Sequence, residues 1–83
     1  MGKTLEQEYR TLLKVISENL KRLRKRAQLT QEQVSHQGGF HTRFYQKLES
    51  GTYSPNLFTL VRAARALKAT LSDLLSTNHQ KHA

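Results

Sequence analysis

Residues 30–51 read TQEQVSHQGGFHTRFYQKLESG, and this stretch decides the fold. Thr30 and Gln33 have the spacing of a capping box, in which the threonine hydroxyl accepts the Gln33 amide hydrogen and the Gln33 side chain reaches back. A helix is therefore predicted to begin after Thr30. Gly38 and Gly39 are predicted to end it, because glycine adopts a positive φ without a Cβ clash.

A second short helix is predicted from about Thr42 to Ser50. Phe40 and Tyr45 are spaced as a hydrophobic staple around an N-cap at His41, and Gly51 follows as a stop signal. Two helices of about two turns, joined by a tight glycine turn, form a helix-turn-helix. The second helix of this motif is the usual reader of the DNA major groove.

A wider set of positions fits one family pattern: Thr30-Gln31-Glu32, Gly39, Tyr45, Leu48-Glu49-Ser50-Gly51, Pro55, Leu60, Ala64, Leu67 and Leu74-Leu75. In these residues the chain resembles the Cro/cI repressor, or xenobiotic-response-element (XRE), helix-turn-helix family. It is most similar there to small regulators such as restriction-modification controller proteins. The resemblance implies an all-α fold, a five-helix lambda-repressor-like DNA-binding domain over residues 17–76. A helical extension over residues 1–16 and a polar tail over residues 77–83 are expected on either side.

Within the helix-turn-helix, four positions depart from the family pattern. Ser35 stands where alanine is usual and Gly38 where a larger apolar residue is usual, so a less filled turn is expected. His41 replaces a small capping residue, which weakens the helix start by about 1 kcal/mol. Phe44 stands where many relatives carry tyrosine, so its ring either packs or meets DNA sugar and methyl groups.

Charge and composition limit the class of protein. Fourteen Lys and Arg against six Asp and Glu give the 83 residues a formal charge of +8, which is typical of a polyanion binder but does not distinguish DNA, RNA and an anionic membrane. The absence of cysteine excludes disulfides and thiolate metal sites and fits a reducing cytoplasm. No apolar run approaches the roughly 18 residues of a membrane span. We expect one cytoplasmic, nucleoid-associated domain of bacterial or phage type that needs no cofactor.

The N-terminal part of the chain carries a helical stripe with two interpretations. Residues 3–27 contain no Gly or Pro, and apolar residues recur at three- and four-residue steps: Leu5, Tyr9, Leu12, Ile16, Leu20 and Leu23. These side chains either pack on their own domain or help to build a dimer, since most of them also fit alternating a and d positions with Asn19 at an a-type site. The extension over residues 3–16 is also the candidate contact for a protein partner.

Five cations lie within residues 21–26: Lys21, Arg22, Arg24, Lys25 and Arg26. They either form a solvated face near a helix C-terminus, where positive charge suits the helix dipole, or attract phosphate, with Arg22 as the candidate ligand. The family resemblance sets Arg24 apart. It matches a helix-one arginine that pairs with the glutamate closing the second motif helix, here Glu49, so a structural ion pair is expected.

The candidate base-reading residues are those left outside when Phe40, Tyr45 and Leu48 turn inward: His41, Thr42, Arg43, Gln46 and Lys47. Arg and Lys donate to guanine O6 and N7, Gln pairs with adenine, and a Thr methyl meets a thymine methyl. The family's base-reading positions match Thr42, Arg43 and Lys47 most directly, then Gln46. In the alternative interpretation, Arg43 contacts no base and binds only phosphate or solvent.

Candidate phosphate ligands flank this helix. Gln31 lies at a helix start, where free amides favour an anion, and the resemblance implies that it clamps the DNA backbone. A second phosphate is expected at four residues of the following turn, which otherwise are ordinary turn residues: Ser50, Tyr53, Ser54 and Asn56. Pro55 suits the first position of the next helix, whose predicted apolar stripe comprises Leu57, Leu60, Val61, Ala64 and Leu67.

A last short helix is predicted from the capping pair Thr70 and Asp73. It carries three leucines that the resemblance implies as a dimer interface: Leu71, Leu74 and Leu75. The tail histidines, His79 and His82, lack acid or thiol companions, so no metal site is expected.

The leading hypothesis is a sequence-specific, homodimeric transcriptional regulator that binds double-stranded DNA at a two-fold-symmetric operator and regulates itself through its own concentration. The alternative is an antitoxin or partner-binding module in which DNA binding is secondary, and a third is general RNA binding. An enzyme is not expected, because Glu32, Glu49 and Asp73 are scattered and no serine or histidine has an evident catalytic partner.

Overall fold

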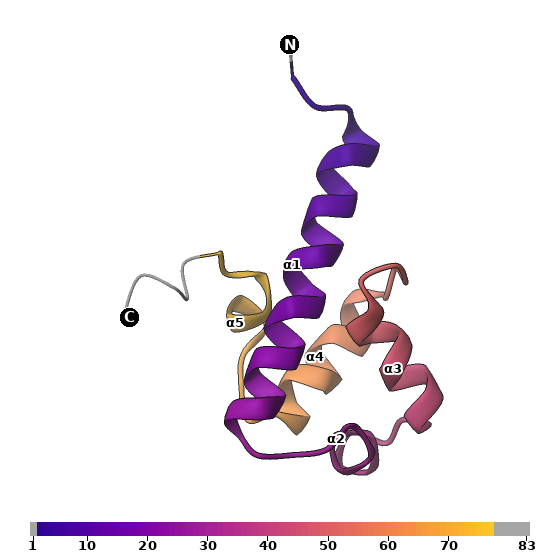
Figure 1. The fold of residues 1–83 in the computed structure, drawn as a ribbon, viewed down its shortest axis with the longest axis vertical. Helices are drawn as coiled ribbons and strands as arrows, with labels where there is room; N and C mark the ends of the chain where they lie inside the picture. The colour runs from indigo at the N-terminus through magenta and orange to yellow at the C-terminus, as the bar shows by residue number, and fades with distance from the viewer. Residues whose placement is uncertain (1, 78–83) are drawn as a thin grey trace.

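The computed structural model describes residues 2–77, which form five α-helices and contain no strand. In chain order these are α1 (Leu5–Arg26), α2 (Gln31–Gly38), α3 (Thr42–Ser50), α4 (Leu57–Ala66) and α5 (Leu71–Leu75) (Figure 1). The expected all-α, five-helix fold is confirmed, and α3 has the predicted bounds. Residues 78–83, with His79, His82 and most of the predicted tail, lie outside the described part.

The predicted caps of the short helices are present. The Thr30 hydroxyl accepts from the Gln33 amide at 3.0 Å, and the Thr30 amide donates to Gln33 Oε1 at 2.8 Å. Thr70 and Asp73 form the same box at the start of α5. Gly39 ends α2 with a φ of 74°, in the left-handed region that favours glycine. Local sequence thus fixes where these helices begin and end.

The long helix α1 is buried against its own domain from Leu13 to its C-terminal end. Its buried apolar residues from Ile16 to Leu23 share one core with residues of the other four helices, including Val34, Tyr45, Leu60 and Leu74. The first turns of α1 project beyond the other helices (Figure 1), and the Leu5 side chain is 82% exposed. The interpretation of packing on its own domain is therefore confirmed from Leu13 onward.

The coiled-coil position suggested for Asn19 is wrong. Asn19 is fully buried, and its amide nitrogen donates to the backbone oxygens of Leu74 at 2.7 Å and Ser76 at 2.9 Å. Its Oδ1 accepts from Arg22 at 3.3 Å. Asn19 therefore fastens the C-terminal end of α5 to α1 within one chain, and it is unavailable to a second α1 helix.

The start of α4 differs from expectation. Asn56, one residue after Pro55, is the N-cap, and its Oδ1 accepts the Thr59 amide hydrogen at 2.8 Å. The buried face of α4 also differs from the predicted stripe, since Thr59 and Leu60 are buried while Leu57 and Val61 are exposed. Two of the five residues predicted for the buried face therefore lie on the surface.

Removing the Asn19 amide tests the link between α5 and α1. We expect Asn19→Ala to lower the free energy of unfolding by about 1–3 kcal/mol, because two backbone carbonyls lose the donor of a buried side chain. Urea denaturation followed by circular dichroism measures this change. Glu18→Ala, on the exposed side of the same helix, is the control, and an equal effect of the two substitutions would contradict the role given to Asn19.

Candidate nucleic-acid interface

The inner face of α3 anchors the helix in the domain. Tyr45 and Leu48 are buried in the core, and Phe44 packs edge-on against Tyr53 with ring centroids 5.4 Å apart. Phe44 also lies 5.7 Å from Phe40, centroid to centroid. Of the two interpretations of Phe44, packing is the one observed. The staple pair Phe40 and Tyr45 is present as predicted, with centroids 6.3 Å apart.

The outer face of α3 carries polar and cationic side chains. Arg43, Gln46 and Lys47 are exposed, as is His41 at the N-cap, whereas Thr42 is half-buried. His41 makes no side-chain capping bond, in line with the weak helix start expected there. The exposed set consists of donors and acceptors of the kinds that recognise base edges.

The predicted ion pair between Arg24 and Glu49 joins α1 to the end of α3. Arg24 Nε donates to Glu49 Oε2 at 2.7 Å and Arg24 Nη2 donates to Oε1 at 3.1 Å, which is a bidentate arrangement. The two side chains are only 13% and 3% exposed. Arg24 Nη1 also donates to the Leu29 carbonyl at 3.0 Å, so the same guanidinium holds the connection between α1 and α2.

The charges around this pair shift three pKa values. Burial by itself would raise the pKa of Glu49, but hydrogen bonds from Arg24 and Gln31 outweigh it, so the Glu49 pKa lies below its ordinary value. The hydrogen bond to Glu49 likewise raises the pKa of Arg24. Burial raises the pKa of Tyr45, and the Glu49 carboxylate raises it further. At neutral pH the carboxylate and the guanidinium are therefore both charged.

Gln31 extends the pair into a chain of hydrogen bonds that the sequence did not indicate. Its Nε2 donates to Glu49 Oε1 at 3.0 Å, and its Oε1 accepts from Gln46 Nε2 at 3.2 Å. The start of α2 is thus connected both to the buried carboxylate and to an exposed amide on the outer face of α3. Gln31, predicted as a phosphate ligand, also orients a candidate base-reading side chain.

The four turn residues predicted to hold a second phosphate have different local roles. The side-chain oxygen of Asn56 caps α4, so for this residue the interpretation as an ordinary turn residue applies. Ser50 Oγ donates to the Lys47 carbonyl at 2.6 Å, and the Ser54 hydroxyl pairs with that of Tyr9 on α1. Tyr53 packs on Phe44 and remains partly exposed. They lie along one turn beside the C-terminal end of α3.

Comparison with known proteins identifies the family. Residues 20–74 match the family described as HTH_3: Helix-turn-helix. The chain belongs to this family. The HTH-type transcriptional regulator y4dJ of Sinorhizobium fredii, described as uncharacterized, is 35% identical over 63 residues, which cover 76% of this chain and 82% of that protein.

Two solved structures are similar to this HTH_3 chain. An HTH_3 family transcriptional regulator from Vibrio cholerae has a TM-score of 0.74 and 28% identity over 78% of this chain, which spans only 36% of that longer chain. A hypothetical transcription factor, NHTF, from Neisseria has a TM-score of 0.78 and 21% identity, and the match covers 86% of this chain and 82% of that one. The Neisseria likeness supports the fold alone.

Two predicted site residues of this HTH_3 domain lie elsewhere than expected. Arg22 is on the α5 side of α1, with its guanidinium bonded to Asn19, rather than on the side that meets α3. Leu74 is fully buried in the core, so its side chain does not face a second subunit. Leu71 is half-buried and Leu75 is 40% exposed, and these two keep apolar surface on α5.

Two cations beside the end of α3, Arg10 and Lys14, were not identified from the sequence, whereas Lys21 belongs to the cationic run described there. Arg10, Lys14 and Lys21 of α1 line a groove whose other wall is the turn at Ser50–Thr52. Their four- and seven-residue spacing places them on one helix face, which was the available signal. Within residues 2–77 there is no cluster of three or more metal-ligating side chains, and no helix there has the length and apolarity needed to cross a bilayer.

Neutralising Glu49 tests the ion pair through its pH dependence. Because the folded-state pKa is depressed, the carboxylate stabilises the fold at neutral pH, and this contribution is lost as the pH falls below about 4.3. We expect Glu49→Gln to cost about 3 kcal/mol at pH 7, since it leaves a half-buried guanidinium without a counter-charge. Urea denaturation at several pH values should show the difference from the wild type shrinking toward pH 3.

The exposed Glu32→Gln is the matched control for the same charge change. It should shift the free energy of unfolding by less than about 0.5 kcal/mol at every pH. A difference between the wild type and Glu49→Gln that does not depend on pH would show that the carboxylate charge is not what holds α1 to α3.

Proposed function

We propose that this protein is a transcriptional regulator that binds double-stranded DNA sequence-specifically, as a homodimer on a two-fold-symmetric operator. The observation that carries the proposal is the outer face of α3, where Arg43, Gln46 and Lys47 are exposed on a helix that a bidentate ion pair fixes to the domain. Membership of the HTH_3 family and the description of the Sinorhizobium relative support the same function.

Base recognition is assigned to the outer face of α3. Arg43 and Lys47, one helical turn apart, donate to guanine O6 and N7. Gln46 reads adenine with the part of its amide that Gln31 leaves open, since one nitrogen proton is already directed to Gln31 Oε1. His41 and the half-buried Thr42 contact bases at the edge of this set. Because the core contacts of Tyr45 and Leu48 and the ion pair of Glu49 hold α3 in one orientation, it reads a narrower range of sequences than a helix free to tilt.

Phosphate contacts hold the register on the duplex. Gln31 lies at the N-terminal end of α2, where the unpaired amides of the first turn favour an anion. Ser50, Tyr53 and Ser54 form the second contact, beside the other end of α3, and the excess of cations attracts the duplex as a whole. These contacts bind DNA of any sequence, and they place a regulator of bacterial or phage type on the nucleoid in the bacterial cytoplasm.

Dimerisation is assigned to α5, and it determines how operator occupancy depends on protein concentration. Leu75, with the half-buried Leu71, forms the contact between subunits, because these leucines keep apolar surface after the core is complete. Two subunits read half-sites about one helical turn apart. Occupancy of the operator then rises with the square of the monomer concentration, which suits a regulator that controls its own gene.

Footprinting on DNA upstream of the protein's own gene tests base recognition. The wild type should protect a two-fold-symmetric site, and Arg43→Ala should lose about 1–3 kcal/mol of binding free energy and relax specificity at one base position per half-site. Arg65→Ala, which removes an exposed cation from α4, serves as the control. Diffuse protection that responds equally to both substitutions would contradict base reading by α3.

The oligomeric state tests the α5 interface. We expect Leu75→Arg to shift sedimentation from dimer to monomer and to abolish the symmetric footprint, because a charge at an apolar contact is desolvated without a partner. Leu57→Arg is the matched control, since Leu57 is an exposed leucine on α4. A dimer that survives Leu75→Arg but dissociates with Leu57→Arg would place the interface on α4 instead.

A further inference from the structure

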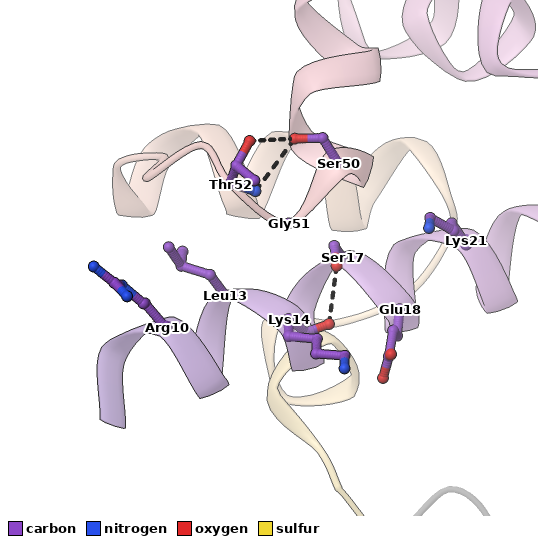
Figure 2. A pocket seen from close by; sticks show the side chains of 9 residues that line it. All are labelled: Arg10, Leu13, Lys14, Ser17, Glu18, Lys21, Ser50, Gly51 and Thr52. Atoms are coloured by element: carbon purple, nitrogen blue, oxygen red, sulfur yellow. Dashed lines mark hydrogen bonds between the residues drawn. The ribbon is translucent and has the colours of Figure 1, made fainter. Parts of the chain in front are cut away.

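A cationic groove lies between α1 and the turn that follows α3. It has a volume of about 430 Å³, and its walls are α1 from Arg10 to Lys21 and the turn Ser50–Thr52. Figure 2 shows Arg10 and Lys21 toward opposite ends of the groove, with the turn along the other wall. Lys14 lies between them along α1, and its side chain is directed away from the turn. Arg10 and Lys14 precede residues 20–74, the part that matches the family.

We propose that this groove binds consecutive backbone phosphates of the DNA duplex, and that the first turns of α1 thereby extend the protein–DNA contact beyond the helix-turn-helix. The inference rests on the proposed function and adds a ligand and a role for the α1 extension. The site consists of the guanidinium of Arg10 and the ammonium groups of Lys14 and Lys21, with the turn at Ser50–Thr52 as its second wall.

The charges in the groove are not satisfied within the domain. The side chains of Arg10, Lys14 and Lys21 make no hydrogen bond or ion pair with any residue of the described part, 2–77. Glu18 also lines the groove, but it leaves two positive charges in excess and pairs with none of the three cations. An anion entering from solvent therefore meets donors that no internal acceptor occupies.

Contacts within the domain fix the two walls of the groove. A Cβ added to Gly51 would lie 3.0 Å from Ser17 Oγ, so the turn approaches α1 as closely as a glycine allows. Ser17 Oγ donates to the Lys14 carbonyl at 2.9 Å, and the Thr52 amide donates to Ser50 Oγ at 3.2 Å (Figure 2). Both walls are therefore in place before DNA arrives.

The dimensions of α3 bring this groove to the DNA backbone. With its side chains an α-helix is about 10–12 Å in diameter, close to the width of the major groove, which is about 12 Å. A helix lying in the groove therefore fills its width, and the segments beside the helix lie next to the phosphates of the groove walls. Arg43, Lys47 and Ser50 follow one face of α3, so a duplex lying on that face continues into the turn at Ser50–Thr52.

The C-terminal end of a helix repels phosphate by itself. Its unpaired carbonyls carry a partial negative charge of about half an elementary charge. Positive side chains from another element must compensate before a phosphate can bind there, and Arg10, Lys14 and Lys21 are the cations beside that end of α3. The start of α2 needs no added cations to bind a phosphate, because the unpaired N–H groups of its first turn carry a partial positive charge.

Salt dependence of binding tests the groove with the full chain. We compare the wild type, the double variant Arg10→Gln/Lys14→Gln, and the matched control Arg65→Gln/Lys68→Gln, which removes the same charge from exposed positions on and after α4. Fluorescence anisotropy on the footprinted duplex and on an unrelated duplex of equal length gives the slope of log affinity against log salt. Glutamine forms helices well, and unchanged thermal unfolding verifies the fold.

We expect the slope of the groove variant to be smaller in magnitude by about 1.8, or 0.9 for each lost phosphate contact, on both duplexes. The bases protected in the footprint should stay the same. In the wild type, a neutral methylphosphonate at the footprint edge should weaken binding, and in the groove variant it should cause little further loss.

Equal slopes for the groove variant and the α4 control would overturn the inference, because net charge alone would then explain both. The proposed function fails separately, if the wild type binds all duplexes alike. In that case the slopes on the unrelated duplex still decide whether the groove binds backbone phosphate. Loss of thermal stability in the groove variant with an unchanged slope would show that these cations serve only the fold.

Discussion

The bidentate pair between Arg24 and Glu49 is the interaction on which the arrangement of the helices depends. The Arg24 guanidinium donates to Glu49 at the end of α3 and to the carbonyl of Leu29 before α2. The Glu49 carboxylate accepts from Arg24 of α1 and from Gln31 at the start of α2. A buried ion pair of this kind adds little net stability over apolar packing, but it tolerates only a narrow geometry. Its contribution is to fix the angle at which α3 projects from the domain.

That constraint matters because α3 is too short to be stable alone. Helices of nine residues are marginal in water, and His41 gives this one no side-chain cap. Stability comes instead from Tyr45 and Leu48 in the core and from Glu49 at the C-terminal end. Because one face of α3 is fully used for attachment, the other remains free for polar side chains.

Local signals made much of the fold predictable. The capping pairs of α2 and α5 and the glycine at residue 39 depend on neighbours within three residues, and each was found where expected. Contacts between distant segments were harder to read. Gly38 indicated a poorly filled turn, but the Phe40 ring covers it so closely that a Cβ would lie 2.6 Å from the ring. Phosphate binding was one interpretation of the charged run in α1. Neighbouring residues of that run lie on different faces of the helix, however, so Lys21 lies beside the end of α3 while Arg22 is bonded to Asn19 on the α5 side.

The different faces of α1 have different roles in the domain. On α1, Arg24 belongs to the buried pair, Asn19 fastens α5, and Lys21 continues the cationic face formed by Arg10 and Lys14. Since a face returns every three to four residues, lengthening such a helix toward its N-terminus adds charge to that face without altering the core. In the proposed function, affinity for the backbone can therefore change through the extension while α3 keeps its specificity. Sequence-independent attraction and base reading would then be set by separate residues of one small domain.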